Sequence, residues 1–314
     1  MKYIESFKKF VIDYEPFDWE KQDKSLYHDK KFVHSLETSF KRFYKVYFYL
    51  KKIELLDKTK KRIVDVGAYP GNMLKLCKHI FGKNISYFAV GLGFSKSYKN
   101  TMKKFNANTI ETELDPTFPY AKKVNKWRTK NNNICLLLDV IEHLVDPVHC
   151  LDEINKSLKK NGYLIITTDN ISNFRYIINM FFSGKSPNIH PLRSSLIYTG
   201  DWRPHFREYS KDELFFYLDY CGYAVIEHEY FDREMGNYFI NEKKQKINKV
   251  YSFKSIRNFL SFFIIKITNL IPHFRSHHII LAQKKREDSK LKKSRIKTDD
   301  KLEWLKIRKK YNVD

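Results

Sequence analysis

The sequence predicts an α/β protein built on a doubly wound, mainly parallel sheet. The clearest observation is the segment 62–72 (RIVDVGAYPGN), in which an apolar strand runs into a tight glycine turn, followed by a helical pattern over 73–81. A second observation is that short apolar runs alternate with helical patterns along the chain, which is typical of βαβ units. With 314 residues, 42% of them hydrophobic, the chain is long enough for one large α/β domain with attachments.

Seven segments have the length and the apolar character of strands. In chain order they are 62–66, 85–90, 107–113, 134–139, 162–168, 223–230 and 277–284. The sequence therefore predicts a core domain over 61–232 that is completed by a last strand at 276–285.

The section that precedes the core, 1–60, is predicted to be a helical cap rich in aromatic residues and lysines. Apolar residues recur at helical spacing between Leu36 and Leu56, which indicates an amphipathic helix. Periodicity shows that one face is buried, but it does not show what the helix packs against.

An unusual insertion, 233–275, separates the last two predicted strands. It is basic over 243–249 and then has a strongly apolar helical pattern over 253–271, interrupted by Lys254, Arg257 and Lys266. A bilayer-spanning helix needs about 20 apolar residues, so we expect this amphipathic helix to lie at a membrane–water interface or to pack on the domain or in a dimer. A charged tail, 286–314, follows the last strand.

The glycine turn indicates what kind of cofactor the core binds. Asp65 lies near the end of the first strand, and Gly67 and Gly71 follow four residues apart, so a ligand can approach the backbone closely. The spacing is neither G-x-G-x-x-G nor G-K-[ST], which argues against a dinucleotide and a nucleoside triphosphate. A cofactor that combines a nucleoside with an amino-acid tail, without phosphates, fits better.

Four motifs in order between Lys61 and Asp232 resemble the class I S-adenosylmethionine (SAM) methyltransferases. They are the glycine turn, ICLLLDVIEHLVDP at 134–147, LKKNGYLIITTDN at 158–170, and HFREYSKDEL at 205–214 with YCGYAVI at 220–226. The second resembles the fourth-strand motif of small-molecule, ubiquinone-biosynthesis-type O-methyltransferases and their glycan-modifying relatives. The third has Asn161 where that family usually has proline.

The resemblance implies a Rossmann-like, seven-stranded sheet with an antiparallel last strand, N-terminal helices over the active site, and SAM as the cofactor. It also implies cofactor contacts at positions that match the family motifs. These are Asp65 near the amino group, the turn residues Gly67, Ala68, Tyr69, Pro70, Gly71 and Asn72, and Asp139, Val140 and Ile141 beside the methyl group.

Two cofactor positions are less well defined. Gly93 occupies the place where the family usually has an acidic residue that binds the ribose hydroxyls. Glu111, Glu113 and Asp115 follow the third strand, where the family contacts the adenine; the sequence does not choose among them, and we take Glu113 as the candidate.

An oxygen acceptor benefits from a general base, because it must lose a proton during methyl transfer. The candidates are His143, His205, His190, Asp201 and Glu208, and His143 and His205 are the two that we predict to be catalytic. His143 lies in a family motif but could equally brace the following loop. Asp139, Glu142 and His143 could share a helical face, yet exposed helix faces are commonly charged, so no metal is predicted.

The formal net charge of +23 favours a polyanionic partner. A lysine-rich composition without such a partner would explain the charge equally well. Nucleic acid is disfavoured, because Thr168–Asn170 has no lysine where ribose 2′-O RNA methyltransferases place one. We expect a small-molecule acceptor: a sugar, a glycan or a lipid-linked intermediate. The alternatives are an RNA methyltransferase and a degenerate, non-catalytic scaffold that binds through basic helices.

The cysteine pattern and the first residues indicate a cytoplasmic protein. The four cysteines are scattered without a C-x-x-C pair, as expected of thiols in a reducing compartment, and the first residues, MKYIESF, contain no apolar signal segment. Contact with the inner face of a membrane would follow from the insertion. The sequence gives no indication of the oligomeric state.

Overall fold

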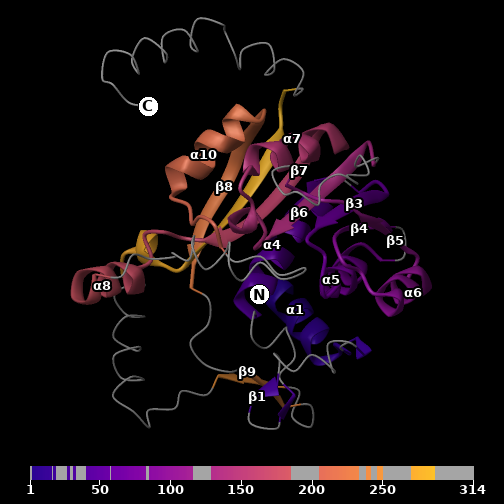
Figure 1. Cartoon of the computed structure of the whole chain (residues 1–314). Coiled ribbons are helices and arrows are strands. Elements are labelled where there is room, and N and C mark those ends of the chain that lie inside the picture. Colours follow the sequence, from indigo (N-terminus) through magenta and orange to yellow (C-terminus); the bar gives the residue numbers. More distant parts are fainter. Residues whose placement is uncertain are drawn as a thin grey trace, which may run out of the picture.

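The computed structural model describes residues 2–15, 17–18, 27–28, 31–32, 40–56, 58–82, 85–115, 129–184, 205–232, 238–241, 246–249 and 270–286. Its centre is a seven-stranded sheet in the order β5-β4-β3-β6-β7-β11-β8. The strands are β3 (Lys61–Val66), β4 (Ile85–Gly91), β5 (Ala107–Glu111), β6 (Asn132–Leu138), β7 (Leu158–Asp169), β8 (Tyr223–Phe231) and β11 (His277–Lys284). The doubly wound sheet is confirmed (Figure 1).

The last strand runs against its neighbours, as predicted. β3, β4, β5, β6 and β7 pair in parallel, whereas β11 pairs antiparallel with both β7 and β8. β11 lies between β7 and β8, and this position places His277 opposite Asp169. The last strand therefore brings its own side chains to the edge of the sheet where the parallel strands end.

Alternate residues of each strand belong to two separate hydrophobic cores, because successive side chains of a strand point to opposite faces of the sheet. On one face, Ile63 and Leu136 pack with the helices α1 (Lys2–Ile12), α4 (Phe40–Leu56), α5 (Asn72–Phe81) and α6 (Lys96–Lys104). On the other face, Val64 and Leu137 pack with α7 (Pro147–Ser157) and α10 (Lys211–Tyr220). The predicted N-terminal helices thus exist and pack on the sheet. All four cysteines are free and buried.

Two local predictions need correction. β7 begins at Leu158 instead of at 162, because Leu158 pairs with Asn132 across a register shift in β6, and Asn161 adopts a left-handed conformation with φ of 61°. The insertion is not purely helical, since β9 (Tyr238–Asn241) and β10 (Lys246–Lys249) form an antiparallel pair within it. The apolar pattern over 253–271 lies outside the described residues, apart from Leu270 and Ile271.

Short elements complete the described chain. They are the strand pair β1 (Tyr27–His28) and β2 (Lys31–Phe32), the single-turn helices η3 (Ile141–His143) and η5 (Pro272–Phe274), and the helix α8 (Phe174–Ser183). α8 lies apart from both helical layers in Figure 1 and contains no buried residue. None of the helices in the described part of the chain is both long and apolar enough to cross a bilayer.

Candidate functional site

The glycine turn after β3 is shaped by two left-handed glycines. Gly67 has φ of 72° and Gly71 has φ of 94°, a region that other residues adopt only with strain. The backbone N–H groups of Gly67 and Ala68 donate to the carbonyl oxygen of Val90, at 2.8 and 3.3 Å. Neighbouring side chains crowd the turn, because a Cβ at Gly67 would lie 2.4 Å from Cγ2 of Val140. Glycine is therefore required here for both conformation and space.

A polar hollow of about 260 Å³ lies on one side of this turn. It is formed where β3 and β6 end, and it is closed by α4, by η3 and by the loop that precedes α10. Its lining residues are Arg42, Asp65, Gly67, Ala68, Tyr69, Pro70, Asn72, Met73, Leu138, Asp139, Glu142, His143 and His205.

An apolar hollow of about 240 Å³ adjoins it on the other side of the turn, at the ends of β3 and β4. Its lining residues are Gly67, Ala68, Tyr69, Gly91, Leu92, Phe94, Glu113, Leu114, Val140, His143 and Leu144. Because Gly67, Ala68, Tyr69 and His143 line both hollows, the two form one elongated site with a polar and an apolar compartment.

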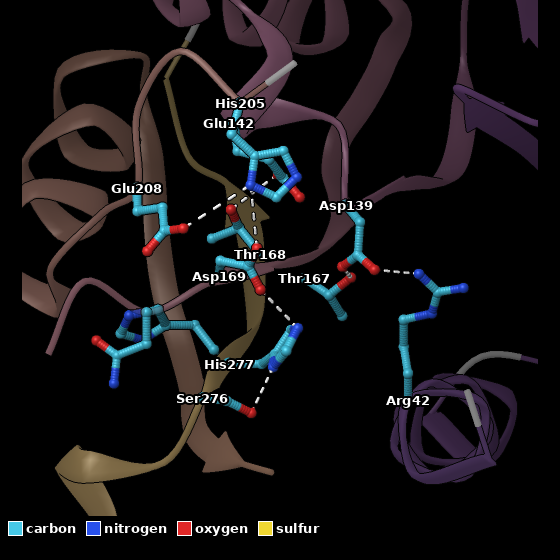
Figure 2. A network of polar contacts seen from close by, with 12 residues as sticks. Arg42, Asp139, Glu142, Thr167, Thr168, Asp169, His205, Glu208, Ser276 and His277 are labelled. Atoms are coloured by element: carbon cyan, nitrogen blue, oxygen red, sulfur yellow. Dashed lines mark hydrogen bonds and ion pairs between the residues drawn. The ribbon is translucent and has the colours of Figure 1, made fainter. Parts of the chain in front are cut away.

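Opposite charges face each other in the polar hollow. Arg42 on α4 forms an ion pair with Asp139, whose other oxygen accepts a hydrogen bond from Thr167 Oγ1 at 2.6 Å (Figure 2). Asp65 is 3% exposed and accepts a hydrogen bond from the hydroxyl of Tyr87. Burial raises the pKa of Asp65 to about 7, against the opposing effects of Tyr87 and Arg42. This carboxyl group therefore changes its charge near neutral pH.

A second network lies behind His205. Nδ1 of His205 is 3.2 Å from Asp169 Oδ2 and 3.8 Å from Glu208 Oε1, and Asp169 Oδ1 is 2.6 Å from Nε2 of His277 (Figure 2). The interactions with Asp169 and, second, Glu208 raise the pKa of His205 to about 10. Burial acts to raise the pKa of Asp169, but the two histidines hold it below its ordinary value. Asp169 is thus an anion that keeps His205 protonated.

The backbone holds His205 beside η3. The N–H of Phe206 donates to the carbonyl oxygen of Glu142 at 2.8 Å, and the rings of His143 and His205 meet edge to face with centroids 4.7 Å apart. Burial, together with the charge of Asp139, raises the pKa of Glu142 to about 8. This corner of the hollow therefore contains a carboxyl group with a raised pKa beside an imidazolium.

A family model described as a methyltransferase domain matches residues 40–228, more than half of the chain. The protein belongs to this methyltransferase family. Among curated proteins, the sequence has no match.

Solved structures with low sequence identity resemble the chain. The chain resembles a putative methyltransferase solved in complex with the Trm112 methyltransferase activator of Haloferax volcanii, at 11% identity and a TM-score of 0.50, over 85% of this chain and 95% of that one. It also resembles a SAM-dependent methyltransferase from Archaeoglobus fulgidus, at 19% identity and a TM-score of 0.44, over 80% and 98% of the two chains. At 11% identity the first of these likenesses shows the fold alone.

The structure of this methyltransferase brings most of the predicted site residues to the two hollows. Three of the predicted cofactor-binding residues line neither hollow, and neither does Glu208, one of the candidate bases. Gly71 shapes the turn, Ile141 is buried in the core of the α7 and α10 face, and Gly93 lies in the loop after β4 with φ of 67°. His190 and Asp201 lie outside the described residues.

The structure also distinguishes the three acidic residues near β5. Glu113 lines the apolar hollow, whereas Glu111 accepts a hydrogen bond from the N–H of Phe94 and pairs with Lys99. Asp115 is fully buried and accepts hydrogen bonds from the backbone of the loop that precedes α7. Of the three, Glu113 is therefore the one placed to contact a ligand.

Sequence reasoning missed Arg42, Asp169 and His277. Arg42 is one of several basic residues on an amphipathic helix, and nothing in its local sequence distinguishes it. Asp169 and His277 lie at the ends of two predicted strands, but only the pairing of β7 with β11 brings them together.

Histidines and carboxylates also come close enough together to suit a divalent cation. The possible ligand atoms of Glu142, His143 and His205 lie within 4.8 Å of one another, as do those of Asp169, His205 and Glu208. Imidazole and carboxylate groups are ordinary ligands of such ions. The prediction that the site works without a metal therefore stays a prediction, to be tested together with cofactor binding.

Proposed function

We propose that the protein is a SAM-dependent methyltransferase that acts on an oxygen atom of a small molecule. The observation that carries this proposal is the pair of joined hollows, apolar and polar, that meet at the Gly67–Tyr69 backbone. SAM has a nucleoside at one end and a zwitterionic amino-acid tail at the other, so its two ends match the two compartments. The absence of a phosphate-binding glycine motif agrees with this assignment.

Each end of SAM has complementary groups in the site. The apolar hollow takes the adenosine, with Glu113 as the acidic group available to it. In the polar hollow, Asp65 takes the ammonium group and Arg42 takes the carboxylate, because each carries the opposite charge and lies beside the turn. Gly93 supplies no carboxylate for the ribose, so backbone groups or Glu113 must contact the ribose hydroxyls.

When bound, SAM supplies an electrophilic methyl group, and the residues around it must align an acceptor for in-line displacement. Such alignment can supply much of the rate enhancement. The acceptor end of the hollow is lined by Glu142, His143 and His205. Because His205 is protonated at neutral pH, it donates a hydrogen bond to the acceptor instead of removing a proton, and His143 is the better candidate for the base.

The acceptor class that we propose is a sugar, a glycan or a lipid-linked intermediate. Support comes from the polar lining of the acceptor end, where hydroxyl groups would find charged and neutral hydrogen-bonding partners. The phenylalanine-rich segment 253–271 would bring the enzyme to a membrane, as a cytoplasmic protein on its inner face. That role rests on the sequence pattern, since most of this segment lies outside the described residues.

The test is isothermal titration of the protein with SAM and with S-adenosylhomocysteine at pH 8 and pH 6. We expect micromolar binding at pH 8 that is about tenfold weaker at pH 6, because a carboxyl group with a pKa of about 7 loses most of its charge over this range. The Asp65→Asn variant should bind more weakly at pH 8 and should lose the pH dependence.

Binding that is absent from folded protein would contradict the proposal and would favour a non-catalytic scaffold. Equal affinities at the two pH values in the native protein would show that Asp65 does not bind the ammonium group of SAM. The same titration with Mg²⁺ and with EDTA shows whether cofactor binding depends on a divalent ion. Nucleotide-activated sugars and membrane extracts are then the first acceptors to assay.

A further inference from the structure

The helix α8 displays large apolar side chains to solvent at its far end. Phe181 is 82% exposed, Phe182 is 80% exposed and Met180 is 51% exposed, and we call these three residues the α8 tip. Leu270, 82% exposed, precedes η5, whose Phe274 contacts Phe174 of α8 with ring centroids 5.6 Å apart. Clustered exposed apolar groups of this size mark a surface that contacts something else.

The first turn of α8 is firmly attached to the domain. Nδ2 of Asn170 donates to the carbonyl oxygens of His273 and Arg275, at 2.8 and 2.6 Å, and the side chain of Asn173 caps the helix by accepting from the N–H of Arg175. The helix then extends away from the sheet (Figure 1). The α8 tip is therefore a projecting surface that is held from its base, and its shape does not suit an extended peptide, which needs a groove.

Two stretches of the sequence, one that contains α8 and one that ends at η5, are basic. No Asp or Glu occurs between Asn170 and Gly200, a stretch that contains Arg175, Lys185 and Arg193. No Asp or Glu occurs between Lys243 and Ser276 either, and that stretch contains eight lysines and arginines. Asn170 and Phe174 contact the end of the second stretch directly. Along the chain, α8 therefore lies within one acid-free stretch, and the residues at its base contact the end of another.

We propose that the α8 tip docks on an anionic phospholipid surface. Phenylalanines on a helix with basic flanks bind at the boundary between lipid headgroups and acyl chains. Each lysine or arginine close to an anionic leaflet adds about 1 kcal/mol of attraction, so the basic residues of the two stretches would select anionic over neutral lipid.

This docking would place the acceptor end of the site beside the bilayer. The hydroxyl of Tyr176 on α8 donates to Glu208 Oε1 at 2.9 Å, and that oxygen lies 3.8 Å from Nδ1 of His205. A single chain of contacts therefore joins the docking helix to the polar hollow. This consequence rests on the proposed function, under which the acceptor is a molecule anchored in, or partitioned into, the membrane.

The test is co-sedimentation of the full chain with vesicles of phosphatidylcholine alone and with vesicles that also contain about 30% phosphatidylglycerol, at low and high salt. We expect pelleting with the anionic vesicles only, weakened by salt. The double variant Phe181→Glu/Phe182→Glu should reduce the affinity about tenfold or more. Both side chains are exposed, so the fold should survive, and circular dichroism checks this.

The matched control is Phe216→Glu, at a position on α10 that is 66% exposed, which should bind vesicles like the native protein. Equal binding of neutral and anionic vesicles, no vesicle binding, or undiminished binding by the double variant would each overturn the proposal. A concentration-dependent dimer that the double variant abolishes would assign the surface to a second copy of the chain and would overturn it too. Vesicle binding is measured without SAM, so its failure is distinct from failure of the proposed function.

Discussion

Replacing Gly67 with alanine is expected to weaken SAM binding about 100-fold, equivalent to about 2.7 kcal/mol. The added Cβ would lie 2.4 Å from Cγ2 of Val140, a side chain that lines the apolar hollow. Since Val140 is branched at Cβ, it cannot swing aside without entering the space that we assign to the nucleoside. Isothermal titration with SAM measures the effect.

Gly184→Ala is the matched control for the backbone strain. Gly184 also has a positive φ, 62°, at the end of α8, but a Cβ there would have nothing within 4 Å. Both variants should lose about 1 kcal/mol of stability from left-handed strain, measured by urea unfolding. Only Gly67→Ala should lose cofactor affinity. If the two variants bind SAM equally well, the turn does not contact the cofactor.

A second large effect is expected in acid, from a half-buried histidine on β8 and a buried histidine on β11. Nε2 of His228 lies 3.0 Å from Nδ1 of His278, and Nε2 of His278 lies 3.1 Å from the carbonyl oxygen of Tyr209. Burial is the main cause that lowers the pKa of His278 to about 3 and that of His228 to about 4. The folded protein therefore keeps both rings neutral at pH values where the unfolded chain binds protons.

Because the pKa values of both histidines are lowered in the folded protein, the free energy of unfolding is expected to fall as the pH falls. Above a pH of about 6.5, the pKa of unfolded histidine, the pair costs no stability. As the pH falls toward the folded values, the unfolded state gains protons that the folded state does not, so the free energy of unfolding falls. For His278 alone, the loss between pH 7 and pH 4.5 is of order 2–3 kcal/mol.

Urea unfolding at several pH values measures this loss. His278→Gln is expected to flatten the decline between pH 7 and pH 4.5, although it lowers stability at pH 7 by removing a buried hydrogen bond. His149→Gln, at a half-buried position on α7, serves as the control and should follow the native curve. Parallel curves for the native protein and His278→Gln would show that other groups cause the acid sensitivity.

Local patterns predicted the backbone of the fold and the centre of the site. The seven strands were found because each has an apolar run of the right length, and the turn at 67–71 was found because its glycines adopt conformations that other residues avoid. The early start of β7 was missed because it depends on pairing of Leu158 with Asn132. The β9–β10 pair was missed because its residues have no clear alternating pattern.

The sequence by itself determined the order of strands and helices, the glycine turn and the acidic residues at the strand ends, because these depend on neighbours in the chain. Only the tertiary structure decided which distant residues share the polar hollow. Arg42 meets Asp139, and Asp169 meets both His205 and His277, because α4 packs on the sheet and β11 pairs with β7. Helical periodicity identifies a buried face but not its partner, so contacts between residues far apart in the chain follow from how the elements pack.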